Sequence, residues 1–199
     1  MSEVKHNLIR VSIDGNICSG KTTCLELLKK FGYQTYTDTS FRTPKLQSGG
    51  CCDRNTLDYH LKLLESYSDP SKNNPKIVFY EGSPYALKSI YPVSIGETKI
   101  KTDTDLEYEN FYQAHAWVPD VIIYLFCDPI VCLERYYSSY GTGQDGQGPT
   151  IFENLKRFHL RLEMIYDEIN CPIKLYKINA QEPPTDLGFY LKEIITHLS

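Results

Sequence analysis

The sequence predicts an α/β fold in three layers, with a five-stranded parallel sheet between two layers of helices. Strand-like and helix-like patterns alternate along the 199 residues, and such alternation favours a parallel sheet with right-handed crossovers. Residues 76–81 and 121–126 are each dominated by a continuous apolar run, as expected of strands that are covered on both faces. A glycine-rich loop at 15–23 lies between the first predicted strand and the first predicted helix.

This loop fits the phosphate-binding pattern G-x-x-x-x-G-K-[ST] at every fixed position. Residues 8–13 before the loop alternate as a β-strand does, and leucines after it recur at helical spacing until Gly32. Because the pattern is meaningful when a strand precedes it and a helix follows it, the context favours a nucleotide site over an ordinary Gly/Ser turn. The fold class is therefore expected to be that of a P-loop NTPase.

The loop contributes nine candidate nucleotide ligands. Its glycines let backbone N–H groups point at phosphate oxygens, and the helix that begins here adds the positive end of its dipole. Lys21 is expected to bridge the terminal phosphates, and the hydroxyl of Thr22 is expected to bind Mg²⁺. The candidate ligands are Gly15, Asn16, Ile17, Cys18, Ser19, Gly20, Lys21, Thr22 and Thr23.

Composition indicates a single domain over residues 1–199 and excludes several classes of function. The net charge is −4, which argues against nucleic acid or an anionic membrane as a partner. No apolar run approaches the ~20 residues of a membrane span, and residues 1–7 do not resemble a signal peptide. We therefore expect a protein of the cytosol or nucleus. The seven cysteines are scattered and predict neither a zinc site nor a disulfide framework.

After the first helix, the chain continues to alternate strands and helices. Residues 33–37 predict a second strand, and the Pro and Gly residues of 39–53 predict a loop. Leucines at helical spacing predict a helix over 57–67. The apolar run at 76–81 predicts the third strand, and a short helix is expected over 84–91.

The second half is expected to contain two strands, four helices and a lid. Asp128 as cap and Pro129 in the first turn predict the start of a helix that runs to residue 139. Gly and Pro make up five of the ten residues at 140–149, which predicts a mobile loop and a lid at about 138–149. The remaining elements are predicted from apolar spacing: helices over 103–117, 151–169 and 187–198, and strands over 121–126 and 173–178.

Functional side chains cluster at predicted strand ends. The phosphate loop follows the first strand, Asp38 the second and Glu81 the third. Ligands of parallel sheets bind beyond the carboxyl ends of the strands. We therefore expect the loop, Asp38 and Glu81 to converge on one site.

These motifs resemble those of the deoxyribonucleoside kinase family, which includes animal, insect and viral thymidine kinases. Gly-Asn-Ile ahead of Ser-Gly-Lys-Thr-Thr at 15–23 is typical of that family, and Glu81-Gly82-Ser83 resembles its Glu-Arg-Ser signature. Residues 123–135 resemble the strand and helix that lead into its lid. The resemblance implies transfer of the γ-phosphate of ATP, with Mg²⁺, to the 5′-hydroxyl of a deoxyribonucleoside. Thymidine or another pyrimidine is the expected substrate.

The resemblance also implies catalytic roles. Lys21 would neutralise the phosphates, and Thr22 and Glu81 would hold Mg²⁺. Asp38 would take the 5′-hydroxyl proton as general base, and Arg135 would stabilise the transferred group. Asp38 stands where the family has a glutamate, and the alternative for it is a turn residue that caps backbone N–H groups.

Five residues are implied as substrate contacts: Asp38, Arg42, Asp58, Leu87 and Tyr91. Tyr91 stands where the family stacks an aromatic ring on the nucleobase, although an ordinary core aromatic is an equal alternative. Leu87 stands where deoxycytidine-preferring members have an acid, so an apolar residue leans toward thymidine. Asp58 and Arg42 could equally be solvated.

The sequence departs from the family pattern at two arginine positions. Gly82 replaces the signature arginine, and Ser138 to Gly143 replace the lid arginines that would follow Arg135. Arginines near a moving phosphoryl group contribute ~10³-fold or more in rate. Arg157 or Arg161 could substitute, but each could equally be a solvated helix residue.

These departures leave two alternatives open: a nucleoside monophosphate kinase of the thymidylate type, and a catalytically weak, nucleotide-binding kinase-like subunit. The expected partners are a nucleoside and ATP, without nucleic acid or membrane. The family's dimers pack two helices from each subunit, and residues 106–117 could pack in this way in a homodimer or serve as core.

Overall fold

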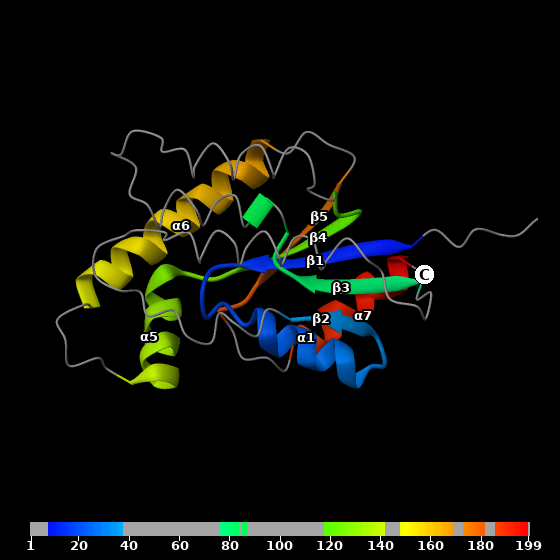
Figure 1. The fold of residues 1–199 in the computed structure, drawn as a ribbon, viewed down its shortest axis with the longest axis horizontal. Coiled ribbons are helices and arrows are strands. Elements are labelled where there is room, and N and C mark those ends of the chain that lie inside the picture. The colour runs from blue at the N-terminus through cyan, green and yellow to red at the C-terminus, as the bar shows by residue number, and fades with distance from the viewer. Residues whose placement is uncertain are drawn as a thin grey trace, which may run out of the picture.

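A computed structural model describes residues 8–37, 76–83, 85–86, 118–141, 148–168, 173–181 and 186–198. These residues form a five-stranded parallel sheet with helices on both faces (Figure 1). The helices predicted over 57–67 and 103–117, and the loop predicted at 39–53, lie outside these ranges. None of the helices within the ranges combines the length and the apolar character that crossing a membrane requires.

The strands confirm the predicted sheet and place the first strand at its centre. Their order is β2-β3-β1-β4-β5, and every neighbouring pair is parallel. In this register Ile13 of β1 lies beside Glu81 of β3 on one side and beside Ile123 of β4 on the other. The strands are β1 (Ile9–Gly15), β2 (Gln34–Tyr36), β3 (Ile77–Glu81), β4 (Val121–Phe126) and β5 (Lys174–Asn179).

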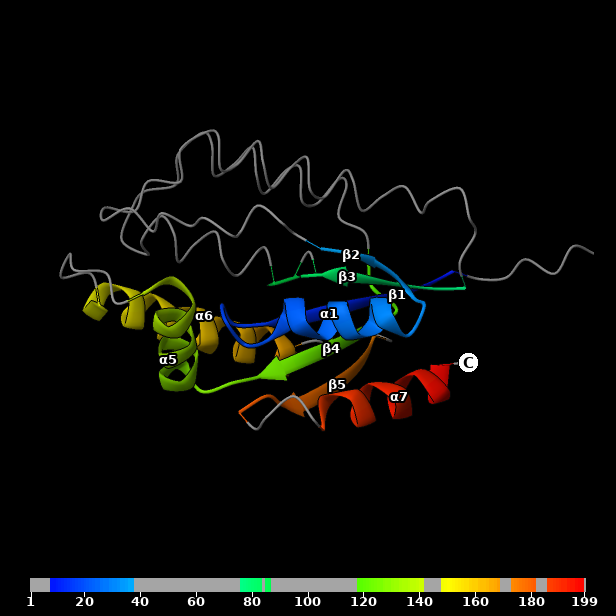
Figure 2. The ribbon, with the colours of Figure 1, turned by 90° about the horizontal axis from the view of Figure 1, so that it is seen from below.

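The helices divide the core into two apolar layers (Figures 1 and 2). Helices α1 (Lys21–Lys30) and α7 (Leu187–Leu198) pack against one face of the sheet, where buried residues such as Leu28 and Ile194 contact inward-facing strand residues. Helix α6 (Gly148–Glu168) covers the other face, with Phe158 and Leu162 in its apolar contact. Strands covered on both faces must be apolar on both faces, as the sequence pattern indicated.

The segments that follow the neighbouring strands β1 and β3 leave on opposite faces of the sheet. The helix after β1 lies on the α1–α7 face, whereas Ala86, shortly after β3, packs with α6 on the opposite face. Neighbouring strands whose connections leave on opposite faces leave a crevice at their carboxyl ends, and ligands of such sheets bind there. The phosphate loop and Glu81 stand at the two sides of this crevice.

Helix α5 (Pro129–Tyr140) lies beyond the carboxyl end of β4 and packs beside the first turns of α6 (Figure 2). The carboxylate of Asp128 accepts a hydrogen bond from the backbone N–H of Ile130 at 2.8 Å, and Pro129 occupies the first turn. The predicted helix start is therefore confirmed.

The ends of the predicted lid are helical. Helix α5 continues to Tyr140, and α6 begins at Gly148, so helix extends into both ends of the range 138–149. Gly141 ends α5 with a φ of 80°, in a region that favours glycine. Pro149 suits the first turn of α6, because its missing N–H has no partner to lose there.

Strands β1 and β5 also extend beyond their predicted ends at residues 13 and 178.

Candidate active site

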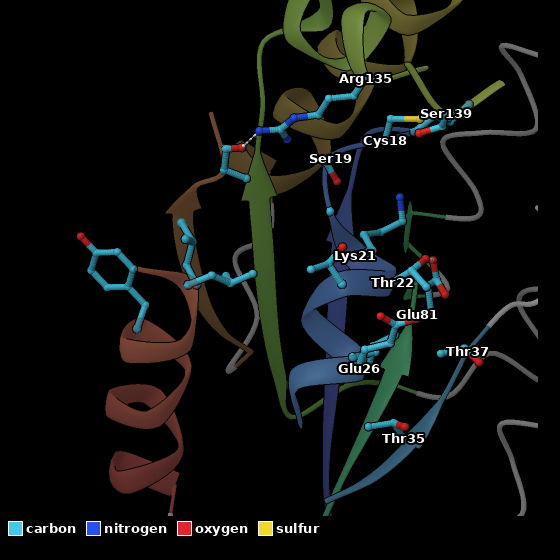
Figure 3. Close-up of a pocket in the computed structure, with 18 of the residues that line it drawn as sticks. Cys18, Ser19, Lys21, Thr22, Glu26, Thr35, Thr37, Glu81, Arg135 and Ser139 are labelled. Atoms are coloured by element: carbon cyan, nitrogen blue, oxygen red, sulfur yellow. Dashed lines mark hydrogen bonds between the residues drawn. The ribbon is translucent and has the colours of Figure 1, made fainter. Parts of the chain in front are cut away.

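A cavity of about 840 Å³ opens at the carboxyl edge of the sheet (Figure 3). The phosphate loop forms its floor, Glu81 and β2 stand at one side, and α5, the end of β5 and the start of α7 form the other side. The predicted convergence of strand ends is therefore observed for the loop and for Glu81. Thr37 also lines the cavity, whereas Asp38, the next residue, lies outside the described residues.

Glycine is required at position 15 because Ser19 and the backbone of Leu125 approach its Cα atom too closely to leave room for a Cβ atom. A Cβ atom at this position would lie 2.5 Å from Oγ of Ser19 and 2.8 Å from the carbonyl oxygen of Leu125. Neither distance is sterically tolerable, so any larger residue must displace the loop or β4. The first glycine of the motif thus lets the chain turn directly over the end of β4.

Asn16 ties the loop to α6. Its side-chain Nδ2 donates to the carbonyl oxygen of Leu155 at 3.0 Å, and its Oδ1 accepts from the backbone N–H of Ile17 at 2.8 Å. Asn16 is fully buried. The hydroxyl of Ser19 is also buried, and it has no hydrogen-bond partner among the described residues. The floor of the cavity is therefore polar and rigidly held, as a phosphate site requires.

The ammonium group of Lys21 stays at the loop. Its Nζ atom donates to the carbonyl oxygens of Gly15 at 3.1 Å and of Asn16 at 2.7 Å. Both partners are neutral carbonyl groups, so the ammonium keeps its full charge for an anion. A phosphate bound in the loop can replace these carbonyls as the partner of Lys21.

Thr22 and Glu81 meet across the crevice between α1 and β3 (Figure 3). Oγ1 of Thr22 donates to Oε1 of Glu81 at 3.1 Å. Hydroxyl and carboxylate oxygens are the hard ligands that Mg²⁺ prefers, usually together with phosphate oxygens and water. The chemistry of these two residues, placed at the mouth of a phosphate loop, fits a magnesium ion.

Arg135 lines the opposite side of the cavity. Its Nη2 atom donates to the carbonyl oxygens of Ala180 at 2.8 Å and of Gln181 at 3.3 Å, and Nη1 lies 3.5 Å from Sγ of Cys127. Figure 3 shows the guanidinium directed toward the β5 side, away from Thr22 and Glu81. To contact a transferred phosphoryl group, Arg135 must leave these carbonyls.

Arginine is otherwise scarce around the cavity. Among the described residues that line it, Arg135 is the one arginine, and neither Arg157 nor Arg161 of α6 contributes. The predicted substrate contacts Arg42, Asp58, Leu87 and Tyr91 lie outside the described residues.

Cys18 of the loop adopts a left-handed backbone conformation, with φ of 59°. Its thiol lines the cavity. Burial raises the pKa of this thiol, while the nearby charges of Lys21 and Arg135 act to lower it. Cys18 is therefore mainly a neutral thiol at neutral pH.

Sequence reasoning missed two parts of the site. The first is the β5–α7 side of the cavity, which includes Asn179, Leu187 and Tyr190. The rule that sites form at strand ends also applies to β5 and could have located this side. The second is Asp14, a fully buried acid one residue before the loop. An acid immediately before the phosphate loop was the available signal.

Asp14 is held by donors from three elements. It accepts hydrogen bonds from the hydroxyl of Ser12, from the backbone N–H and hydroxyl of Ser83, and from the hydroxyl of Tyr166. Burial raises the pKa of the Asp14 carboxyl above its ordinary value, and the hydrogen bonds from Ser12, Ser83 and Tyr166 oppose this rise.

The family model for deoxynucleoside kinases matches residues 11–182. A search of curated proteins finds no match.

Solved structures share the fold. A deoxyadenosine kinase from M. mycoides with the products dCMP and dCDP bound aligns with a TM-score of 0.69 and 15% identity, over 96% of this chain and 100% of that chain. A deoxyadenosine kinase from the same organism with bound dATP aligns with a TM-score of 0.68 and 16% identity, over 94% of this chain and 100% of that chain.

Proposed function

The chain belongs to the deoxynucleoside kinase family, and from this premise we propose that it transfers the γ-phosphoryl group of ATP to the 5′-hydroxyl of a pyrimidine deoxyribonucleoside, with thymidine the favoured substrate. The observation that carries the proposal is the pairing of Thr22 with Glu81 at 3.1 Å beside the phosphate loop. Ligands of parallel sheets bind beyond the carboxyl ends of the strands, so a carboxylate at the end of β3 that is paired with the first turn of α1 supports a role beside the end of a bound polyphosphate.

The reaction replaces one phosphorus–oxygen bond by another. The bond between the γ-phosphorus and the bridging oxygen of ATP breaks, a bond to the 5′-oxygen forms, and the hydroxyl proton passes to Asp38. Phosphoryl transfer depends mainly on positioning and on charge neutralisation. The loop N–H groups and Lys21 bind the phosphates, and Asp38 follows Thr37, which lines the same cavity.

Thr22 and Glu81 are the residues that would hold Mg²⁺. When bound, the ion neutralises charge that develops on the β- and γ-phosphate oxygens. The chain's own contribution is to keep two oxygen ligands 3.1 Å apart at the mouth of the loop. Arg135 is the candidate for the remaining negative charge, once its guanidinium has left the carbonyls of Ala180 and Gln181.

Nucleobase preference is assigned to residues 87 and 91. Tyr91 would stack on the base, and the apolar Leu87 would favour thymine over cytosine, while Arg42 and Asp58 would complete the substrate contacts. The M. mycoides complexes contain dCMP, dCDP or dATP, so both purines and pyrimidines belong in the test.

We also propose a homodimer through residues 106–117, which light scattering after size-exclusion chromatography would detect.

A product assay tests the proposal. The protein is incubated with Mg²⁺-ATP and each of the four deoxyribonucleosides, or with thymidylate, and monophosphates and diphosphates are separated by chromatography. We expect thymidine to be converted fastest. Consumption of thymidylate alone would identify a monophosphate kinase. Measurable ATP binding without product from any acceptor would identify a nucleotide-binding subunit without turnover.

Asp38→Asn tests the general base. The amide cannot accept the 5′-hydroxyl proton, so we expect kcat to fall by about 10²–10⁴-fold while ATP affinity is unchanged. Asp167→Asn, on an exposed part of α6, is the matched control and should leave kcat unchanged. Retention of turnover in Asp38→Asn would remove Asp38 from this role.

A further inference from the structure

A buried hydrogen-bond network lies directly behind the proposed metal site. Its centre is the carboxyl group of Asp14, which joins β1 to the turn after β3 and to α6. Asp14, Ser12 and Ser83 are fully buried, and Tyr166 is 7% exposed. None of these four residues lines the cavity, so the network does not contact a ligand there directly.

Every acceptor position of the Asp14 carboxyl group is used. Oδ1 accepts from the hydroxyl of Ser12 and from the backbone N–H of Ser83, the latter at 2.6 Å. Oδ2 accepts from the hydroxyls of Ser83 and Tyr166, each at 2.5 Å. A carboxylate offers about four lone-pair sites, so four donors from three directions leave the group no freedom to rotate. Fully satisfied buried networks of this kind rigidify the elements that they join.

The turn that follows Glu81 is held by several hydrogen bonds. Gly82 donates its N–H to the carbonyl oxygen of Ile13 at 3.0 Å, and Ser83 bonds to Asp14 through both its N–H and its hydroxyl. The same hydroxyl accepts from the backbone N–H of Ala86 at 3.1 Å. The chain is therefore fixed at consecutive residues immediately after Glu81, and the carboxylate of Glu81 is directed at Thr22.

We propose that Asp14 and Tyr166 are positioning residues for the metal site: through Ser83 they lock the turn after β3, so that the Glu81 carboxylate faces the Thr22 hydroxyl. This inference rests on the proposed metal role of Glu81. Burying a carboxyl group costs folding free energy that a well-packed apolar residue would avoid. A role in orienting a metal ligand explains why the chain has a polar network at this position. Partners that orient metal ligands typically contribute 10–100-fold to metal affinity or activity.

Tyr166→Phe is the primary test, because it removes one donor to Asp14 and keeps the ring. Binding of Mn²⁺ is measured by electron paramagnetic resonance in the presence of a non-hydrolysable ATP analogue, and binding of the analogue without metal is measured by calorimetry. We expect Mn²⁺ binding about 10-fold weaker and analogue binding without metal unchanged. Tyr124→Phe is the matched control. Tyr124 is buried, and its ring centroid lies 4.7 Å from the ring centroid of Tyr166, but its hydroxyl makes no hydrogen bond to Asp14.

A double-mutant cycle with Glu81→Gln identifies the route of the effect. If Tyr166 acts through Glu81, Tyr166→Phe will weaken Mn²⁺ binding in the wild-type background and have no further effect in Glu81→Gln. Equal effects in both backgrounds would overturn the positioning role. So would a Tyr166→Phe protein that binds Mn²⁺ as tightly as Tyr124→Phe does.

The two proposals fail in distinguishable ways. If Glu81→Gln leaves Mn²⁺ binding unchanged, the metal role of Glu81 is wrong and the inference about Asp14 falls with it. If Glu81→Gln weakens binding but Tyr166→Phe does not, the positioning inference alone is wrong. Asp14→Asn replaces an acceptor oxygen by an amide N–H₂ group, which cannot accept a hydrogen bond from Ser12, Ser83 or Tyr166. This variant should therefore weaken Mn²⁺ binding more than Tyr166→Phe does. Should Asp14→Asn fail to fold, the result with Tyr166→Phe decides.

Discussion

The charge of Lys21 is held at the phosphate loop by carbonyl oxygens of the loop itself. Because Gly15 and Asn16 contribute neutral acceptors, at 3.1 and 2.7 Å, no carboxylate has to be displaced before an anion can bind. Contacts to an ionised donor are roughly twice as strong as contacts between neutral groups. The geometry of one side chain therefore supports a direct role on phosphate.

Lys21→Ala should lower kcat strongly without unfolding the protein. Loss of one preorganised charge at a transferred group costs about 10²–10³-fold in rate, and steady-state kinetics with Mg²⁺-ATP will measure it. Lys30→Ala is the control, because Lys30 is an exposed residue of the same helix outside the cavity. Equal kcat values for the two variants would contradict the role of Lys21.

Cys18 should react slowly with iodoacetamide at neutral pH. Burial raises the pKa of its thiol above the ordinary value of 9.0, so the reactive thiolate forms only at higher pH. Mass spectrometry of the peptide that contains Cys18 will give the rate as a function of pH. We expect the rate to rise above pH 9 and to fall when ATP occupies the loop. A plateau below pH 9 would contradict this prediction.

At the scale of elements, the strand–loop–helix unit depends on one point of close contact. The turn from β1 into α1 passes over β4 at Gly15, where a methyl group would lie 2.8 Å from a backbone oxygen of Leu125. Backbone atoms of a central strand cannot move away cheaply, so the loop itself must shift. This explains in steric terms why the first motif position is glycine.

Gly15→Ala should therefore destabilise the fold and weaken nucleotide binding together. Overpacking of this kind costs about 1–3 kcal/mol, which denaturant unfolding will measure alongside ATP affinity. Gly188→Ala, in α7, is the control: its methyl group would make ordinary contact with Phe31 at the end of α1, and the change should stabilise the protein by about 0.4–1 kcal/mol. A Gly15→Ala protein with unchanged stability and ATP affinity would show that the contact is unimportant.

At the scale of the whole molecule, the sheet order decides where the site forms. β1 lies between β3 and β4, and the segments after β1 and β3 leave on opposite faces. The crevice between their ends brings the loop and Glu81 together from positions about 60 residues apart in the chain. Because Asn16 of the loop bonds to α6 and Thr22 bonds to Glu81 of β3, ligand binding should be linked to global stability.

ADP should stabilise the entire fold against unfolding. A ligand that binds only the native state at 100 times its Kd contributes about 2.7 kcal/mol. Chemical denaturation with and without ADP will measure this increment. Lys21→Ala should show a smaller increment at the same ADP concentration. An unfolding midpoint that does not respond to ADP would contradict nucleotide binding at the loop.

Much of the architecture could be read from patterns that are local in the chain. The helix cap at Asp128, the apolar strands and the phosphate loop each depend on residues close in sequence, and each is observed. The lid boundary was less predictable, because Gly and Pro suit both a loop and the ends of helices. Helix at Tyr140, Gly148 and Pro149 therefore occupies part of the range 140–149 that was expected to be loop.

The sequence by itself determined the fold class and the family, and it predicted the chemistry of the loop, because periodicity, turn residues and motif spacing act over a few residues. Only the tertiary structure decided which distant groups meet: that Glu81 faces Thr22, that Arg135 bonds to Ala180, and that Asp14 is surrounded by donors from β1, the turn after β3 and α6. Such contacts depend on strand order and on how helices pack across a sheet. Neither is encoded in any single segment of the chain.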